Sequence, residues 1–442
     1  MSTFPEAAGP HAGAVRRCLD RIAACPDMAG VALLARRDKD AMAEALLRDA
    51  LAALTGAQGP LAGRVLCVKA CFDVRGWVTH AGSRVLADAP PAREDGGAVA
   101  ALRAAGAVLL AQTNMTEFAY GALGLNPWYG TPLTPLDPGA RRVAGGSSSG
   151  GAVAVAGAMA DLALVSDTSG SARIPAAFCG VAGFKPSQGR YDGRGMMRLA
   201  PSFDVPGVIA PDAQGCLLAD LALAPHEAAD RAAHGGVRGR RYVVPRHVEA
   251  LLDAAVGEAF EQWLRRLREA GAQVRRAALP SVRLAGEIAR DGGMIAAEAY
   301  ALHAGRLAAG AAGYDPRVGP RILLGAQASA HRYAAARLRL RELRAQFDRE
   351  LDDAEAVLTP TVPMLPPRLA DLDDDAAYLR ENARAFSLTE FANRLDLPSI
   401  SLPDAGGARL PAGLLVTGRR LRDRALLHGA LAVQAALGDA VS

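Results

Sequence analysis

Short apolar runs alternate along this chain with segments whose apolar residues recur at helical spacing. The apolar runs predict strands, which fall at residues 65–68, 107–112, 162–166, 241–244, 274–278, 356–360, 399–402 and 412–416. The helical spacing predicts helices, which fall at residues 38–54, 98–104, 116–120, 152–158, 173–178, 251–271, 285–308, 329–353, 388–393 and 423–437. This repeated alternation favours an α/β fold with a partly parallel sheet.

The chain shows no internal repeat and no low-complexity linker. Residues 186–211 are rich in Gly, Pro, Arg and Ser and are interpreted as loops around a site. Residues 213–239 start at helical spacing and continue into glycines, which suggests a surface excursion more than a domain boundary. The sequence therefore predicts one domain over residues 1–442, with a helical segment at 1–62 and a second half at 212–442 that completes the sheet and the substrate pocket.

Composition removes several classes of function. Half of the 442 residues are apolar and 22% are charged, as in soluble globular proteins. The net charge of +4 is spread along the chain, so nothing points to nucleic acid or an anionic membrane as a partner. No signal peptide is recognised, and the apolar stretch at 152–166 is too short to span a bilayer. Six scattered cysteines lack zinc-ligand spacing and are interpreted as reduced thiols, so we expect a cytoplasmic protein without a metal.

The most informative stretch is a small-residue loop, GGSSSGG, at residues 145–151. A flexible linker is one interpretation, although apolar segments flank the loop on both sides. A phosphate cradle would need a G-x-x-x-x-G-K-[ST] or G-x-G-x-x-G pattern, and neither is present. A loop at a helix N-terminus would instead offer backbone N–H groups to negative charge and hydroxyls for proton transfer.

A second loop, Asp167-Thr-Ser-Gly-Ser171, follows the strand predicted at 162–166 directly. Such a turn lies at the exposed end of a sheet, as a nucleophile does, although helix capping by Ser171 is an alternative. Lys69 ends another predicted strand and is one of only three lysines among fifty basic residues. Unlike arginine, a buried lysine can lose its proton, although a lysine at a strand end can simply extend to solvent. Together the two loops and Lys69 suggest a serine nucleophile activated by a lysine base.

Histidine offers a competing base. His80 lies in a turn-like segment near the loops, and a Ser-His-Asp arrangement with His303, His331 or His428 is an alternative that spacing leaves open. These last three histidines fall on helical patterns, which favours a surface or core position.

The chain resembles the amidase signature hydrolases. The resemblance is close over residues 63–211 and rests on VLCVKACFDVRG, TNMTEFAYGALGLN, GGSSSGG and DTSGSARIPAAFCGVAGFKPSQGR. Weaker similarity continues through YDPRVGPRILLGAQASAHRY, AVLTPTVP and LDLPSISLP. It implies one domain built on a large mixed β-sheet flanked by helices.

The resemblance also assigns roles. It places the base on Lys69, the cis-linked bridging serine on Ser147 and the acyl-forming nucleophile on Ser171. The oxyanion-hole N–H groups would come from Thr168, Ser169, Gly170 and Ser171, and residues 115–126, with Met115 and Phe118, would contact substrate. Three positions depart from the family pattern, namely Ser169 for glycine, Ala70 for an acid and Thr134 for asparagine.

The implied activity is cleavage of a small-molecule amide through an acyl-enzyme, with no cofactor. Alternatives are the A subunit of a glutamine-dependent tRNA amidotransferase, an esterase, or a binding protein without turnover. The segment HRYAAARLR, after Ser329 and Ala330, lacks the paired tyrosines sought in the amidotransferase. Retention of the Lys69, Ser147 and Ser171 set argues against the binding protein. A homodimer is left open.

Overall fold

The computed structural model describes residues 9–56, 59–226, 235–290, 293–310, 313–404 and 412–438. Within them, eleven strands form one mixed sheet, in the order β1-β3-β2-β4-β6-β5-β10-β11-β9-β7-β8. The strands are β1 Leu33–Arg36, β2 Val65–Lys69, β3 Val108–Thr113, β4 Leu162–Asp167, β5 Ala182–Lys185, β6 Val205–Ala210, β7 Arg241–Pro245, β8 Gln273–Ala277, β9 Ala356–Pro360, β10 Ser399–Leu402 and β11 Leu414–Thr417. The predicted mixed α/β fold is confirmed.

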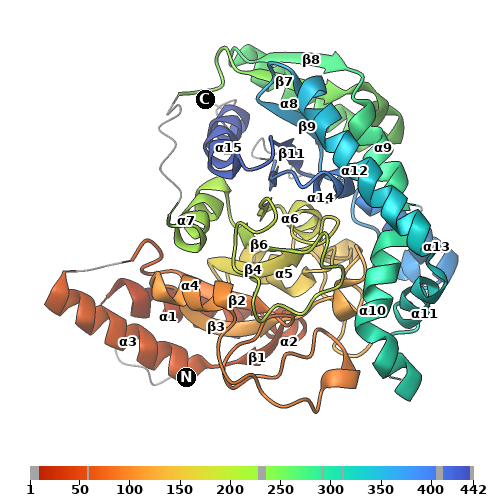
Figure 1. The fold of residues 1–442 in the computed structure, drawn as a ribbon. Helices are drawn as coiled ribbons and strands as arrows, with labels where there is room; N and C mark the ends of the chain where they lie inside the picture. The colour runs from red at the N-terminus through yellow and green to blue at the C-terminus, as the bar shows by residue number, and fades with distance from the viewer. Residues whose placement is uncertain are drawn as a thin grey trace.

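The helices flank this sheet (Figure 1). They are α1 Pro10–Ala24, α2 Pro26–Ala32, α3 Asp38–Thr55, α4 Gly97–Ala104, α5 Ser149–Ala156, α6 Arg173–Cys179, α7 Ala213–Leu223, α8 Ala254–Glu269, α9 Pro280–Arg290, α10 Gly293–Ala309, α11 Gly319–Leu323, α12 Ala330–Leu351, α13 Asp375–Phe386, α14 Glu390–Arg394 and α15 Asp423–Gly438. The region predicted as one helix at 285–308 holds parts of two helices, α9 and α10.

Alternate side chains of the central strands enter two separate cores. On β2, Leu66 and Val68 belong to the larger core, whereas Val65 and Cys67 belong to the smaller one. The smaller core is closed by α1, α2, α3 and α5, and α4 and α7 contribute to the larger core. Because both faces are covered, these strands are apolar throughout, which is why they appear in the sequence as short continuous apolar runs.

Strand β6 corrects the prediction of loops over residues 186–211. It lies between β4 and β5 and pairs antiparallel with both. Pro206 and Gly207 conceal this strand in the sequence, because both residues disfavour strands. Gly207 is required here, since a Cβ at this position would lie 2.8 Å from the Phe184 carbonyl oxygen.

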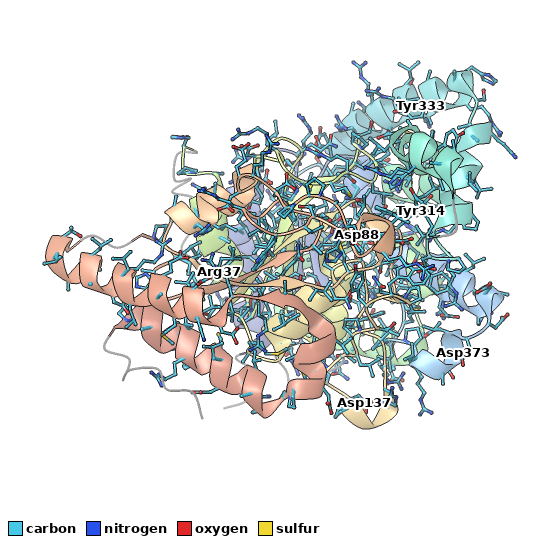
Figure 2. The ribbon with its side chains drawn as sticks, turned by 90° about the horizontal axis from the view of Figure 1, so that it is seen from below. Arg37, Asp88, Asp137, Tyr314, Tyr333 and Asp373 are labelled. Atoms are coloured by element: carbon cyan, nitrogen blue, oxygen red, sulfur yellow. The ribbon has the colours of Figure 1, made fainter. Side chains whose placement is uncertain are left out.

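The two halves of the chain are joined through the middle of the sheet. Strand β5, from the first half, pairs with β10 of the second half, with Lys185 opposite Ser399. Helices α10, α11, α12 and α13 stand along one flank, on the right in Figure 1. Figure 2 shows Tyr314 and Tyr333 on this flank, well away from α3. The described residues contain no helix long and apolar enough to cross a membrane.

Candidate active site

Lys69 ends strand β2 and is fully buried. Strands β2 and β4 run parallel, so the end of β4 reaches the same edge of the sheet. The Lys69 Nζ atom lies 2.7 Å from Ser147 Oγ and 2.8 Å from Ser166 Oγ. Sequence reasoning missed Ser166 as a neighbour of the lysine, because the sequence marks it only as the last residue of a predicted strand.

Burial lowers the pKa of the Lys69 ammonium to about 8. Removing a cation from water disfavours its charged form, and within the described residues this ammonium contacts hydroxyl groups and no carboxylate. Cys71, Asp167 and Asp204 act in the opposite direction and raise this pKa, but they do not offset the burial. Lys69 is therefore poised to exist partly as a neutral amine near neutral pH.

The loop at residues 145–151 is buried and continues into helix α5, so the linker interpretation is wrong. Its glycines are needed for close approach. A Cβ on Gly146 would lie 2.6 Å from the Gly124 nitrogen, and one on Gly150 would lie 2.4 Å from the Ala32 carbonyl oxygen. The Gly146–Ser147 peptide is cis, and the Ser147 carbonyl accepts a hydrogen bond from the Thr116 N–H at 3.0 Å. These contacts fix Ser147 beside Lys69.

The loop after β4 is held by the carboxylate of Asp167. This carboxylate accepts hydrogen bonds from the Gly170 N–H at 2.8 Å and from the Ala172 N–H at 3.0 Å. The Gly170 N–H, expected among the oxyanion donors, is thus already engaged by Asp167. Ser171 is 1% exposed and borders the cavity described below. Among the described residues no hydrogen bond joins the Ser171 and Ser147 hydroxyls.

Arg173 pairs with Asp167 inside the protein. Both side chains are completely buried, and the guanidinium contacts the carboxylate through two nitrogens at 3.0 and 3.1 Å. Burial alone would raise the pKa of Asp167, but the charge and hydrogen bonds of Arg173 hold it at about 2. Asp167 therefore stays ionised and keeps its hold on the loop.

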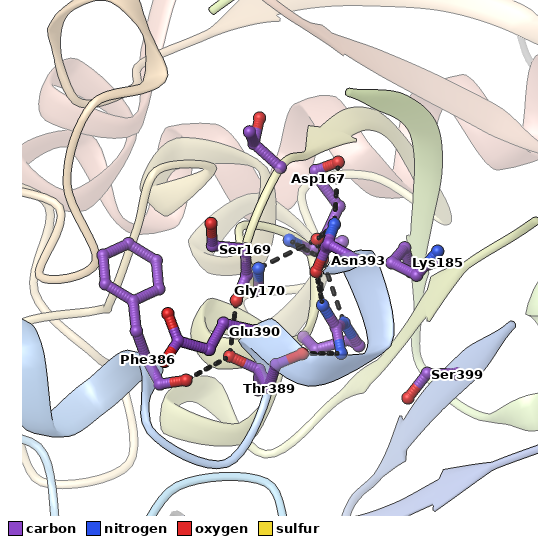
Figure 3. A network of polar contacts seen from close by, with 12 residues as sticks. Asp167, Ser169, Gly170, Lys185, Phe386, Thr389, Glu390, Asn393 and Ser399 are labelled. Atoms are coloured by element: carbon purple, nitrogen blue, oxygen red, sulfur yellow. Dashed lines mark hydrogen bonds and ion pairs between the residues drawn. The ribbon is translucent and has the colours of Figure 1, made fainter. Parts of the chain in front are cut away.

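Helix α14 and the residue before it support the same loop from the second half of the chain (Figure 3). Thr389 Oγ1 donates to the Ser169 carbonyl at 2.6 Å, and Asn393 Nδ2 donates to Asp167 Oδ1 at 2.9 Å. Gly170 has a φ of +142°, and a Cβ there would lie 2.3 Å from Thr389 Oγ1. This position therefore demands glycine. These partners lie more than two hundred residues from the loop, where sequence spacing offers no signal.

The two remaining side chains of the loop are also engaged. Thr168 Oγ1 donates to Asp204 Oδ1 at 2.6 Å, and burial raises the pKa of Asp204 to about 6. The Ser169 hydroxyl accepts a hydrogen bond from Arg394 at 3.0 Å. Serine at position 169, where the family usually has glycine, therefore has a specific partner in this chain.

A cavity of about 780 Å³ opens beside Ser171. It is lined by Ala119, Tyr120, Thr168, Ser169, Ser171, Leu199, Ile288, Gly293, Met294, Ile295, Ala296, Arg321, Leu324, Gln327, Ala328, Ser329, Arg332, Tyr333, Ala336, Asn382, Ala383, Phe386, Glu390 and Arg394. Loops of the first half carry the serines, and helices of the second half close the walls.

Met115 and Phe118, predicted to contact substrate, do not line this cavity. Both are buried, and the Phe118 ring packs against His303 with centroids 4.3 Å apart. Phe118 has a φ of +48°, a local backbone geometry that the predicted short helix did not anticipate. Their neighbours Ala119 and Tyr120 form part of the wall instead.

Histidine is not placed to act as the base. His303 is buried and its Nδ1 lies 3.0 Å from the Tyr314 hydroxyl, while His80 Nδ1 accepts the Gly82 N–H at 3.1 Å. In the described part of the chain no histidine lines the cavity, and no group of three His, Cys, Asp or Glu side chains is arranged to hold a metal. All six cysteines are free thiols.

Comparison with known proteins agrees with this geometry. The family model described as "Amidase" matches residues 13–427. The chain is 35% identical to 2-amino-5-chloromuconic acid deaminase of Comamonas testosteroni, covering 86% of this chain and 83% of the relative. It is also 35% identical to the A subunit of the glutamyl-tRNA(Gln) amidotransferase of Halobacterium salinarum, covering 86% of this chain and 96% of the relative. The crystal structure of an amidase superposes with a TM-score of 0.86 at 33% identity, covering 98% and 97% of the two chains. The chain therefore belongs to the amidase signature family.

Proposed function

We propose that this protein hydrolyses a small-molecule carboxamide to a carboxylate and ammonia or an amine, with Lys69, Ser147 and Ser171 as the catalytic residues. The observation that carries the proposal is the buried contact of 2.7 Å between Lys69 Nζ and Ser147 Oγ, next to a cavity bordered by Ser171. Ser171 has the position of a nucleophile because its loop ends a strand and opens onto that cavity.

In the proposed reaction, neutral Lys69 accepts the Ser147 proton while Ser147 accepts the proton of Ser171. The hydrogen bond between the two serines forms as substrate binds, because catalytic contacts often tighten only in the complex. Ser171 Oγ attacks the carbonyl carbon, and the amide π electrons move to oxygen. The N–H groups of Thr168, Ser169 and Ser171 are the proposed donors to that oxyanion, each contributing on the order of 3 kcal/mol.

The tetrahedral species collapses by expelling the amine, which takes back a proton from the relay. This leaves an ester between the acyl group and Ser171. Water, losing its proton to the same relay, attacks the ester carbonyl and releases the carboxylate and the Ser171 hydroxyl. Every proton is returned, so the residues alone balance the reaction.

The amidotransferase alternative keeps support from one relative, the glutamyl-tRNA(Gln) amidotransferase chain of Halobacterium salinarum. Another relative, 2-amino-5-chloromuconic acid deaminase, favours the small-molecule interpretation. The two functions differ in their need for a partner. Release of ammonia from an amide by the purified chain alone supports the hydrolase, and release that requires an added partner protein supports the amidotransferase.

The lysine base is tested by Lys69→Arg, beside Lys69→Ala. Arginine keeps the positive charge but stays protonated, so a base role predicts that both variants lose roughly 10²- to 10⁴-fold in kcat. A purely electrostatic role predicts that arginine retains activity within a few-fold of the parent. Folding is checked by circular dichroism.

The nucleophile is tested separately by covalent labelling with a fluorophosphonate. Ser171→Ala should abolish labelling, while Ser387→Ala, adjacent in sequence to the cavity residue Phe386, should label like the parent protein. Mass spectrometry locates the adduct. An adduct on another serine in Ser171→Ala would refute the assignment.

A further inference from the structure

The charged side chains in the cavity wall are mainly arginines. Arg321, Arg332 and Arg394 line the cavity, and Glu390 is the one carboxylate among its lining residues in the described part of the chain. A buried or partly buried cation is costly unless an anion compensates it. Each arginine must therefore be examined for a partner within the protein.

Arg394 is already committed to the protein. Its guanidinium donates to Ser169 Oγ at 3.0 Å and to the Thr168 carbonyl at 3.4 Å, and it lies 3.9 Å from Glu390. It also stacks over the Phe203 ring at 4.4 Å and is 3% exposed. Arg394 is therefore a positioning residue for the loop that carries Ser171.

Arg321 and Arg332 have no such compensation. The Arg321 guanidinium lies 4.2 Å over the Tyr120 ring and donates to the Tyr120 carbonyl at 2.8 Å. Arg332 is exposed in the first turn of α12. Neither forms an ion pair with a carboxylate in the described residues. The start of α12 adds its positive helix-dipole end to the same wall, through the lining residues Ala328, Ser329 and Arg332.

We propose that Arg321 and Arg332 bind a carboxylate on the substrate, so that the preferred substrates are amides of acids that carry a second, free carboxylate. This inference rests on the proposed amide hydrolysis and names its substrate class. A guanidinium offers a planar fork that matches the two oxygens of a carboxylate. Binding at this wall would hold the amide end of the same molecule toward Ser171 across a cavity of small-molecule size.

The charge balance favours a carboxylate over a phosphate. Glu390 lies in the same wall and sits beside Arg394, so the cavity offers two uncompensated cations. A monoanion is neutralised by this arrangement, whereas a dianionic phosphate would also meet the field of Glu390. Phosphate-bearing amides are therefore a counter-test.

The test compares matched substrates. Monoamides of malonic, succinic and glutaric acids are paired with neutral alkyl amides of equal length, and an amide bearing a phosphate replaces the carboxylate in a third series. We expect the parent enzyme to prefer the carboxylated series by roughly 10- to 100-fold in kcat/KM. Arg332→Gln and Arg321→Gln should remove most of this preference through KM, and Arg332→Lys should keep part of it.

Arg337→Gln is the matched control, because Arg337 is an exposed arginine of the same helix that does not line the cavity. It should keep the preference. Fluorophosphonate labelling of Ser171 reports whether each variant retains a working site. Equal or better turnover of the neutral or phosphate series, no turnover of the carboxylated series by a labelled enzyme, or a preference unchanged in both glutamine variants would refute the carboxylate site. Absence of labelling in the parent would instead refute the proposed function itself.

Discussion

At the scale of single residues, the burial of Lys69 sets the pH at which the proposed reaction can run. A general base must be neutral, and burial lowers the pKa of Lys69 to about 8. Below that pH the neutral fraction falls about tenfold per unit. We therefore expect kcat/KM to rise about tenfold per pH unit up to about pH 8 and to level off above it.

This profile is measured from about pH 5 to about pH 10, a range that spans the ordinary pKa of histidine and approaches that of lysine. Asp204 titrates nearby, with a pKa raised by burial to about 6, so Asp204→Asn serves as the comparison. That variant should lose any inflection near pH 6 and keep the one near pH 8. A profile of the parent that is flat between about pH 6 and about pH 9 would contradict the lysine base.

Residues differ in how far sequence alone could place them. Lysine is rare in this chain, so Lys69 stood out, and Ser147 and Ser171 stood in loops of unusual composition. Arg321 and Arg332 lie on helices among dozens of other arginines, so nothing in the sequence separated them from surface charges. Their place in the cavity wall depends on tertiary packing.

At the scale of elements, the loop after β4 depends on a buried ion pair. Arg173→Met would leave the Asp167 carboxylate buried with its charge uncompensated. We expect the free energy of unfolding to fall by about 3–5 kcal/mol at neutral pH, as urea titration would measure. The pKa of Asp167 is lowered to about 2, so the pair stabilises the fold above the ordinary pKa of about 3.8 and this stabilisation is lost as the pH falls toward 2.

Arg380→Met is the control for that substitution, because Arg380 pairs with Glu381 at an exposed position. Its loss should cost less than about 1 kcal/mol. The double variant with Asp167→Asn and Arg173→Met should recover part of the stability, since no buried charge is left alone. An Arg173→Met protein as stable as the Arg380→Met protein would show that Asp167 does not need its partner.

The elements that the sequence predicted well are those whose own residues decide them. Helix α3 begins with Asp38 and Asp40 in its first turn and ends at Gly56, whose φ is +67°. The sequence predicted it to within one residue. Strand β6 was missed because its Pro and Gly oppose strand formation locally, and only its pairing with β4 and β5 maintains it.

At the scale of the whole molecule, the sheet and the site both combine the two halves of the chain. The junction is the pairing of β5 with β10, and Thr389 and Asn393 cross it to hold the loop around Ser171. Neither half has a complete sheet or a complete cavity by itself. Sequence reasoning predicted one domain from the absence of a linker, whereas the structure supplies the physical reason to test that prediction.

The single-domain prediction can be tested with the three tryptophans. Trp77 and Trp128 lie in the first half, and Trp263 lies in α8 of the second half. Trp263→Phe leaves fluorescence from the first half only, and the double variant Trp77→Phe with Trp128→Phe leaves fluorescence from the second half only. If the halves unfold as one unit, the fluorescence midpoint of each variant should coincide with its own midpoint by circular dichroism. This comparison is made within each protein, so any destabilisation by the substitution cancels. Because the Ser171 loop is held from both halves, fluorophosphonate labelling should be lost at the same denaturant concentration. A variant whose fluorescence transition separates clearly from its dichroism transition would show that one half unfolds independently of the other.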